Sequence, residues 1–169
     1  GPGHLALFGY DPLMYRVGRG VLSALGVGLE LRSGDIAARG NFATIDPVTG
    51  IVTDRRAGRI PTDLCVRLCE RLQAEIPSVE DVEVIVRPEK EHRFVLVLRG
   101  EDLDPDVTDT DPQREGVPPQ EPRPRRPQAE RTARILRTWV ERARSVLVSE
   151  TPANMVLLRG LDRRPELPA

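Results

Sequence analysis

The sequence has little of several features that would assign it to particular classes of protein. No apolar run approaches the roughly 18 residues that a membrane-spanning helix needs, and no signal peptide is visible. Cys65 and Cys69 are the only cysteines, which is typical of a reduced, cytoplasmic protein; without a nearby histidine they indicate core residues, not a metal pair. The net charge of -1 excludes a global basic field. We therefore expect a cytoplasmic protein with no nucleic-acid or membrane partner.

Lysine is nearly absent, whereas arginine is abundant. Lys90 is the only lysine among 25 basic residues, so 24 are arginines. Genomic base composition can by itself produce such a bias. It still supplies many planar guanidinium groups, which bind carboxylates and phosphates through two parallel hydrogen bonds. The 169 residues are enough for one ordinary domain with a core of its own.

A strand–turn–strand pattern over residues 36–60 is the most informative local feature. Alternation along 36–43 predicts a strand with two different faces. Residues 46–50 read DPVTG, and this combination of proline and glycine is typical of a turn. A second, shorter strand over 51–54 follows, so the pattern predicts a hairpin.

This hairpin carries polar side chains that folding could bring together. They are Arg39, Asn41, Asp54, Arg55 and Arg59. Guanidinium groups fixed on strands would form a donor array suited to a phosphate or a carboxylate. The alternative is a solvated hairpin whose charges pair with surface acids. Spacing alone leaves both interpretations open.

The remaining periodicities predict an α+β fold. Apolar stripes at helical spacing, and runs rich in β-branched residues, alternate along the chain. The predicted helices cover 21–25, 61–76 and 128–149, and the further strands cover 82–86, 94–98 and 154–158. This order predicts a mostly antiparallel sheet with helices packed on one side, as in a cap domain.

Composition changes sharply over residues 101–127, which are rich first in aspartate and then in proline. The spacing of the aspartates is similar to that of a calcium-binding loop. However, Val107 and Gln113 occupy the positions where such a loop has glycine and glutamate. A loop of this length is usually functional or disordered.

Several longer motifs run through the chain. They are GPGHLALFGYDPLMYRVGRGVLSALGVGLEL at 1–31, DIAARGNFATID at 35–46, TDRRAGRI at 53–60, Glu91-His92-Arg93, Asp109-Thr110-Asp111-Pro112, and the segment from Asn154 to Gly160. Together they resemble the archaeal-type 2,3-bisphosphoglycerate-independent phosphoglycerate mutases, members of the alkaline-phosphatase-like superfamily. In that family the nucleophilic serine lies immediately before the Gly-Pro-Gly-His segment, so the resemblance implies a serine just before Gly1. The family's metal ligands lie before that serine or beyond the equivalent of Ala169.

The resemblance implies a fragment of a metal-dependent isomerase. Residues 1–20 would be the tail of a phosphatase-like core, 21–160 an inserted substrate-clamping domain and 161–169 the link back to the core. The whole enzyme would interconvert 3-phosphoglycerate and 2-phosphoglycerate in glycolysis through a phosphoserine, with Mn or Mg ions and without 2,3-bisphosphoglycerate. This fragment would hold neither a catalytic nor a metal-binding residue, would be inactive alone, and would have the missing core domain as its partner.

The resemblance also implies that the inserted domain holds the glycerate through arginines, with Arg39, Arg55 and Arg59 as the clamp. The full set of expected substrate-binding residues is His4, Arg39, Asn41, Asp54, Arg55, Arg59, His92 and Arg93. His4 could instead cap a helix, and His92 could be a solvent-facing histidine at the end of a strand. Two other functions remain: a cap domain of a related phosphotransferase or phosphatase acting on another small hydroxy acid, and a non-catalytic binding module.

Overall fold

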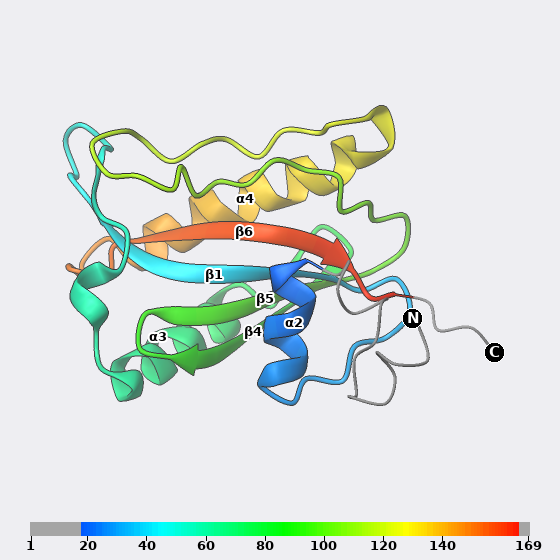
Figure 1. Cartoon of the computed structure of the whole chain (residues 1–169), viewed down its shortest axis with the longest axis horizontal. Helices are drawn as coiled ribbons and strands as arrows, with labels where there is room; N and C mark the ends of the chain where they lie inside the picture. The colour runs from blue at the N-terminus through cyan, green and yellow to red at the C-terminus, as the bar shows by residue number, and fades with distance from the viewer. Residues whose placement is uncertain (1–17, 166–169) are drawn as a thin grey trace, which may run out of the picture.

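Figure 1 shows the computed structural model, which describes residues 18–165. Its elements are α2 (Arg19–Gly26), β1 (Ile36–Ile45), β2 (Val52–Asp54), the 3₁₀ turn η2 (Ala57–Arg59), α3 (Thr62–Glu75), β3 (Ser78–Val79), β4 (Val82–Lys90), β5 (Arg93–Arg99), the 3₁₀ turn η3 (Pro127–Ala129), α4 (Glu130–Val146) and β6 (Met155–Arg163). Every strand pairing is antiparallel, which confirms the predicted α+β class. No helix in residues 18–165 is long and apolar enough to cross a membrane.

The long strand β1 lies at the centre of the sheet. It pairs with β5 on one side and with β6 on the other, and β4 and β3 extend the sheet beyond β5. β2 pairs only with the last two residues of β1, Thr44 and Ile45. The expected hairpin therefore exists, but strands far away in the sequence flank most of β1.

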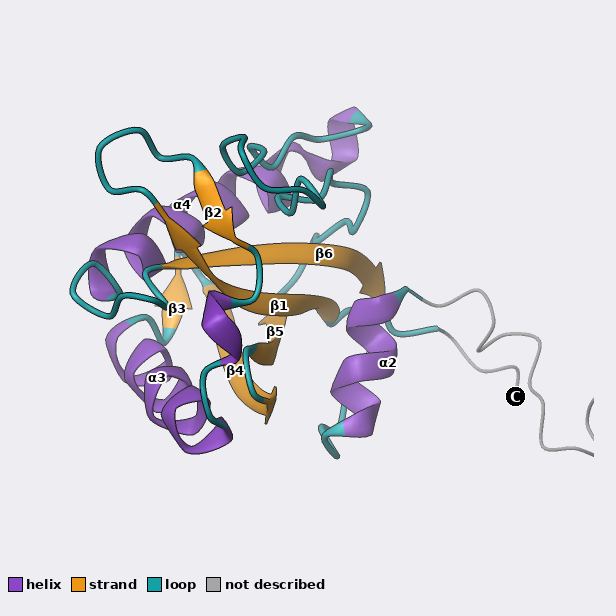
Figure 2. Cartoon of the chain, turned by 60° about the vertical axis from the view of Figure 1, so that its left-hand side comes forward, coloured by secondary structure: helices purple, strands orange, loops and turns teal. Residues whose placement is uncertain are grey.

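One face of the sheet packs against α3 and α4 and contains the main core. Alternation along β1 turns Ile36, Ala38 and Phe42 to this face, where they join Phe94 and Trp139. A Cβ atom at position 40 would lie 2.3 Å from the ring of Phe94, so only glycine lets that ring cross β1. Figure 2 shows both helices on the same side of the sheet. The prediction that the helices pack on one side holds for these two and is wrong for α2, which packs on the opposite face.

The opposite face of the sheet is covered only in part. α2 packs Val21 and Ala24 against Ala37, Val95 and Val97, and it lies on the side away from α3 and α4 (Figures 1 and 2). A Cβ atom at position 20 would lie 2.1 Å from a backbone oxygen of β1, so a glycine there permits this close packing. Further along this face Ala43, Met155 and Leu157 join Val52 in a small apolar cluster, and polar side chains lie between that cluster and α2.

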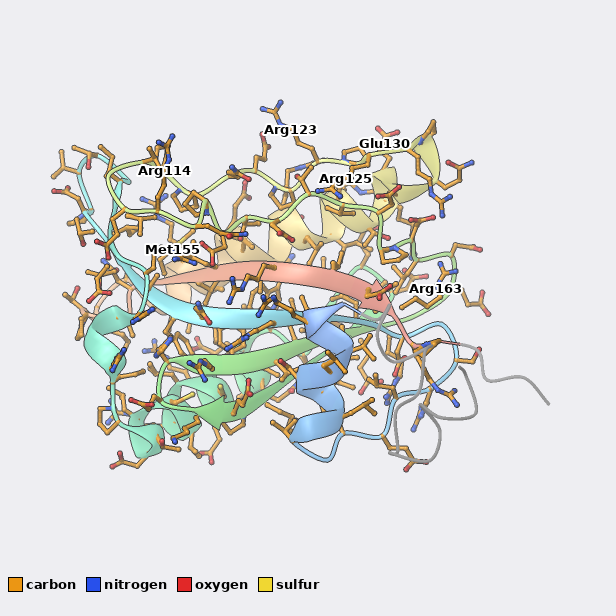
Figure 3. The ribbon with its side chains drawn as sticks, viewed as in Figure 1. Arg114, Arg123, Arg125, Glu130, Met155 and Arg163 are labelled. Atoms are coloured by element: carbon orange, nitrogen blue, oxygen red, sulfur yellow. The ribbon has the colours of Figure 1, made fainter. Side chains whose placement is uncertain are left out.

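Residues 101–127 form a strap that runs along α4 and β6 (Figure 1). A backbone bridge between Val107 and Pro124 joins its two limbs. Arg123 lies on its outer edge and points away from the fold (Figure 3), with 74% of its side chain exposed. The long loop predicted from the sequence is thus attached to the domain along its length.

Candidate functional site

Three arginines gather on the part of the sheet that α2 leaves open. Arg39 lies on β1, directly opposite Arg159 of β6. Arg93 lies on β5, opposite Asn41 of β1. Strand alternation turns all four side chains to the same face as Ala37, so three neighbouring strands contribute to one polar surface. We call Arg39, Arg93 and Arg159 the arginine face.

The guanidinium groups of the arginine face have no acidic partner among residues 18–165. Other arginines of the chain do have one. Arg99 lies 2.8 Å from the buried Asp35, and Arg134 lies 2.9 Å from Glu80. The arginine face is therefore distinguished from the general excess of arginine by the absence of close ion pairs within residues 18–165.

Buried polar atoms without a hydrogen-bond partner concentrate at this surface. Within residues 18–165, five of the six such side-chain atoms belong to it or to its border: Arg39 Nε, Arg159 Nε, Asn41 Oδ1, Glu89 Oε2 and His92 Nδ1. A buried donor or acceptor without a partner costs about 1–3 kcal/mol, so proteins rarely leave several together. Such a group indicates a site that a ligand or another part of a protein completes.

Like charges crowd the arginine face. Burial, followed by the charges of Arg93 and Arg159, lowers the pKa of Arg39. Burial, followed by the charge of Arg19 at the start of α2, lowers the pKa of Arg159. Mutual repulsion of this kind disfavours the charged forms, and a bound anion would relieve it.

Arg55 borders the arginine face and is held by an acid. Its Nε and Nη2 atoms donate to the two carboxylate oxygens of Asp111 at 3.1 and 3.0 Å. Asp111 is buried in the strap, and its own backbone N–H donates to Leu158 of β6 at 3.1 Å. Both residues lie close enough to Arg159 to affect the pKa of its guanidinium.

Asp54 supports the turn that carries Arg59. Its carboxylate accepts hydrogen bonds from the backbone N–H groups of Arg56 and Gly58, each at 2.8 Å. Ala57, Gly58 and Arg59 all have positive φ, between 48° and 64°. Left-handed conformations at non-glycine residues cost about 1–3 kcal/mol each and are common near functional sites.

His92 lies at the turn between β4 and β5, with 4% of its surface exposed. Its backbone oxygen accepts a hydrogen bond from Phe42 of β1 at 2.7 Å. Burial, followed by the charge of Arg93, lowers the pKa of its imidazole, and the charges of Arg56 and Arg59 act in the same direction. The charges of the η2 segment and of the arginine face thus act on His92 together.

The structure places the sequence-predicted residues in two neighbouring groups. Arg39, Asn41 and Arg93 share the polar face of the sheet, whereas Asp54, Arg55 and Arg59 lie on the segment after β2. The short pairing of β2 does not by itself bring Arg55 next to Arg39; Arg159 lies between the two groups.

Two expectations fall on the first residues of the chain, outside those that the structure describes. His4 is one of the expected substrate-binding residues, and its place relative to the arginine face stays a prediction. Gly1 is the residue before which the resemblance implies the nucleophilic serine. The position of that serine also stays a prediction, because the structure describes no residue next to it.

Comparison with known proteins identifies the family. The model of the 2,3-bisphosphoglycerate-independent phosphoglycerate mutase family matches residues 1–154. The chain belongs to this family. A probable 2,3-bisphosphoglycerate-independent phosphoglycerate mutase of Thermus thermophilus is 54% identical over 168 residues, and the corresponding protein of Aquifex aeolicus is 47% identical over 174.

The solved structure of the cofactor-independent phosphoglycerate mutase from Thermoplasma acidophilum superimposes with a TM-score of 0.82 at 37% identity. It covers 96% of this chain, and the match takes in 46% of the Thermoplasma chain. The chain spans 41% of the length of the Thermus relative and 43% of the Aquifex relative. It therefore corresponds to less than half of a typical member of the mutase family.

Sequence reasoning missed two residues of this candidate site. Arg159 lies one residue past the expected end of the last strand, and Glu89 lies in an irregular part of β4 near Arg39. The alternation that places Leu157 on the polar face also places Arg159 there, so extending the strand would have found it. No sequence signal marks Glu89, because the β4 bulge that positions it depends on pairing with β5.

The potential metal-ligating side chains of residues 18–165 are dispersed. Among residues 18–165, no group of three or more histidine, cysteine, aspartate or glutamate side chains could hold a metal ion. The carboxylates nearest the arginine face are Asp111, which binds Arg55, and Glu89. The chemistry that these residues support is anion binding.

Proposed function

We propose that this chain holds the anionic groups of 3-phosphoglycerate and 2-phosphoglycerate in a cofactor-independent phosphoglycerate mutase. The observation that carries this proposal is the half-buried arginine face, which has no ion pair among residues 18–165 and in which two Nε donors are buried without an acceptor. A phosphoglycerate has a carboxylate and a phosphoryl group, and guanidinium groups bind both bidentately. Arg55, already oriented by Asp111, would extend the surface at its edge.

The arrangement suits a reaction that must retain its intermediate. Moving a phosphoryl group between two hydroxyls of glycerate requires that the glycerate stay bound while its other hydroxyl is presented. Arginines on a surface that closes over the reacting groups would hold the acid and exclude water. In the proposed full enzyme, the serine nucleophile and the Mn or Mg ions belong to the rest of the polypeptide, which would act in the cytoplasm.

The ends of the described segment support its interpretation as an inserted domain. The backbone N–H of Gly18 donates to the carboxylate of Asp162 at 2.6 Å, so the chain enters and leaves at one place. α2 begins at this place and covers one face of the sheet (Figure 2), and strand register puts the arginine face on the same side. We therefore propose that residues 21–160 form the inserted domain and that its polar face is directed toward the core domain.

The direct test is a titration of the 169-residue chain with 3-phosphoglycerate, followed by NMR. We expect shifts centred on the backbone amides of Arg39, Arg93 and Arg159. Replacing Arg39 or Arg159 by glutamine should weaken binding by about tenfold or more, because each loses charge-assisted hydrogen bonds. Arg134→Gln is the matched control, since Arg134 pairs with Glu80 on the other side of the sheet. Equal losses in the control, or shifts confined to other surfaces, would refute the proposal.

A further inference from the structure

Two buried acceptors border the arginine face, and an anion cannot satisfy them. Asn41 is 7% exposed, and its Oδ1 atom has no hydrogen-bond donor. The Oε2 atom of Glu89 is likewise buried without a donor. The oxygens of carboxylates and phosphates only accept hydrogen bonds in their ionised forms. A ligand that is only an anion would therefore leave both acceptors unpaired.

Asn41 and Glu89 flank the same arginine. Asn41 is the cross-strand partner of Arg93 on β1. Glu89 lies on β4 at the register shift between Pro88 and Lys90, which face Phe94 and Arg93 of β5. The negative charge of Glu89 also acts on Arg39 and partly offsets the lowering of its pKa. Donors and acceptors thus alternate across three strands within one surface.

Resting on the proposed function, we infer that Asn41 and Glu89 form a hydroxyl-recognising subsite that selects hydroxy acids over acids without a hydroxyl. A ligand hydroxyl would donate to one of the two acceptors while the arginines bind its charged groups. A site with buried acceptors discriminates strongly against an analogue that lacks the hydrogen-bonding group, because the protein atoms are then left unpaired. This assigns Asn41 and Glu89 to specificity and the arginines to affinity.

The experiment compares two probes on the 169-residue chain: 3-phosphoglycerate and 3-phosphooxypropanoate, which differ only by the hydroxyl at C2. Their dissociation constants would be measured by NMR titration. We expect the native chain to prefer 3-phosphoglycerate by about tenfold or more. Asn41→Leu, which keeps the branch at Cγ without the polar atoms, or Glu89→Met should reduce the preference to about twofold or less, according to which of the two acceptors the hydroxyl uses. Glu83→Met is the control, because Glu83 lies on the same face of β4 but opposite Arg99.

The possible outcomes separate this inference from the proposed function. Equal affinity of the native chain for the two probes would overturn the hydroxyl subsite and leave the anion-binding function standing. Retention of the full preference in folded Asn41→Leu and Glu89→Met chains would do the same. Binding of neither probe would overturn the proposed function and the subsite with it. Because the measured quantity is a ratio, the change in overall anion affinity when Glu89 loses its charge does not affect the conclusion.

Discussion

At the scale of single residues, two buried asparagines of this domain show opposite behaviour. Asn154 is 5% exposed, and its amide both accepts from and donates to the backbone of Ile45, at 2.8 and 2.9 Å. Asn41 is equally buried, but its Oδ1 atom has no partner. The first asparagine stabilises the fold, whereas the second costs stability, a cost that the proposed hydroxyl subsite would explain.

This contrast predicts that replacing asparagine by leucine changes the free energy of unfolding in opposite directions at the two positions. Asn41→Leu should raise the free energy of unfolding, by about 1 kcal/mol, because it removes a buried acceptor without breaking a protein hydrogen bond. Asn154→Leu should lower it by about 1–3 kcal/mol, because the backbone groups of Ile45 would lose their partners. Urea unfolding followed by circular dichroism measures both. A destabilised Asn41→Leu chain would show that Asn41 has a structural role.

At the scale of elements, the helices and strands follow from local patterns, but their ends and partners do not. The sequence pattern ends the last strand at Leu158, because Gly160 looks like a break. In the structure Gly160 has a φ of 69° and lies within β6, at a shift of register that lets the chain pass close to Arg19. The strand therefore continues through Arg159, which joins the candidate site although the local sequence pattern ends the strand before it.

The hairpin also shows how far local sequence patterns predict structure. The turn over residues 46–50 and the short strand β2 were predictable from proline, glycine and alternation. The neighbours of Arg39 were not, because they come from β5 and β6, which lie more than 50 and more than 100 residues further along the chain. Long-range strand pairing depends on the packing of the whole sheet, and no local pattern encodes it.

The strap is the element whose loss we expect to affect the site most. Thr110 is buried, and its Oγ1 atom accepts a hydrogen bond from Leu158 N–H at 2.8 Å. Thr110→Val preserves the shape but leaves that donor unpaired, so it should lower the free energy of unfolding by about 1–3 kcal/mol. Thr53→Val, at an exposed position on β2, should change it by no more than about 0.5 kcal/mol. Urea unfolding of both variants measures these changes. Equal changes would show that the hydrogen bond between Leu158 and Thr110 makes no specific contribution to stability.

At the scale of the whole molecule, the net charge of -1 conceals a strong separation of charge. Many arginines on the helices and the strap pair with acids, whereas Arg39, Arg93 and Arg159 of the arginine face do not. Electrostatic repulsion between these arginines also acts on His92, in the β4–β5 turn. The backbone oxygen of His92 is bonded to Phe42 of β1, and the charges of Arg56 and Arg59 reach it from the η2 segment. The protonation of His92 would add a further positive charge at this junction.

The stability of the whole chain should therefore depend on pH through His92. Burial, followed by the charge of Arg93, depresses the pKa of His92 in the folded state, so the unfolded state binds its proton more tightly. The corresponding stability is fully present above the unfolded pKa of about 6.5 and is lost as the pH falls through the folded pKa. Urea unfolding at pH 7.5 and 5.5 should show this loss in the native chain, a clearly smaller loss in His92→Gln, and an unchanged loss in His4→Gln, which keeps His92. If His92→Gln retained the full pH dependence, the destabilising charge would have to lie elsewhere in the molecule.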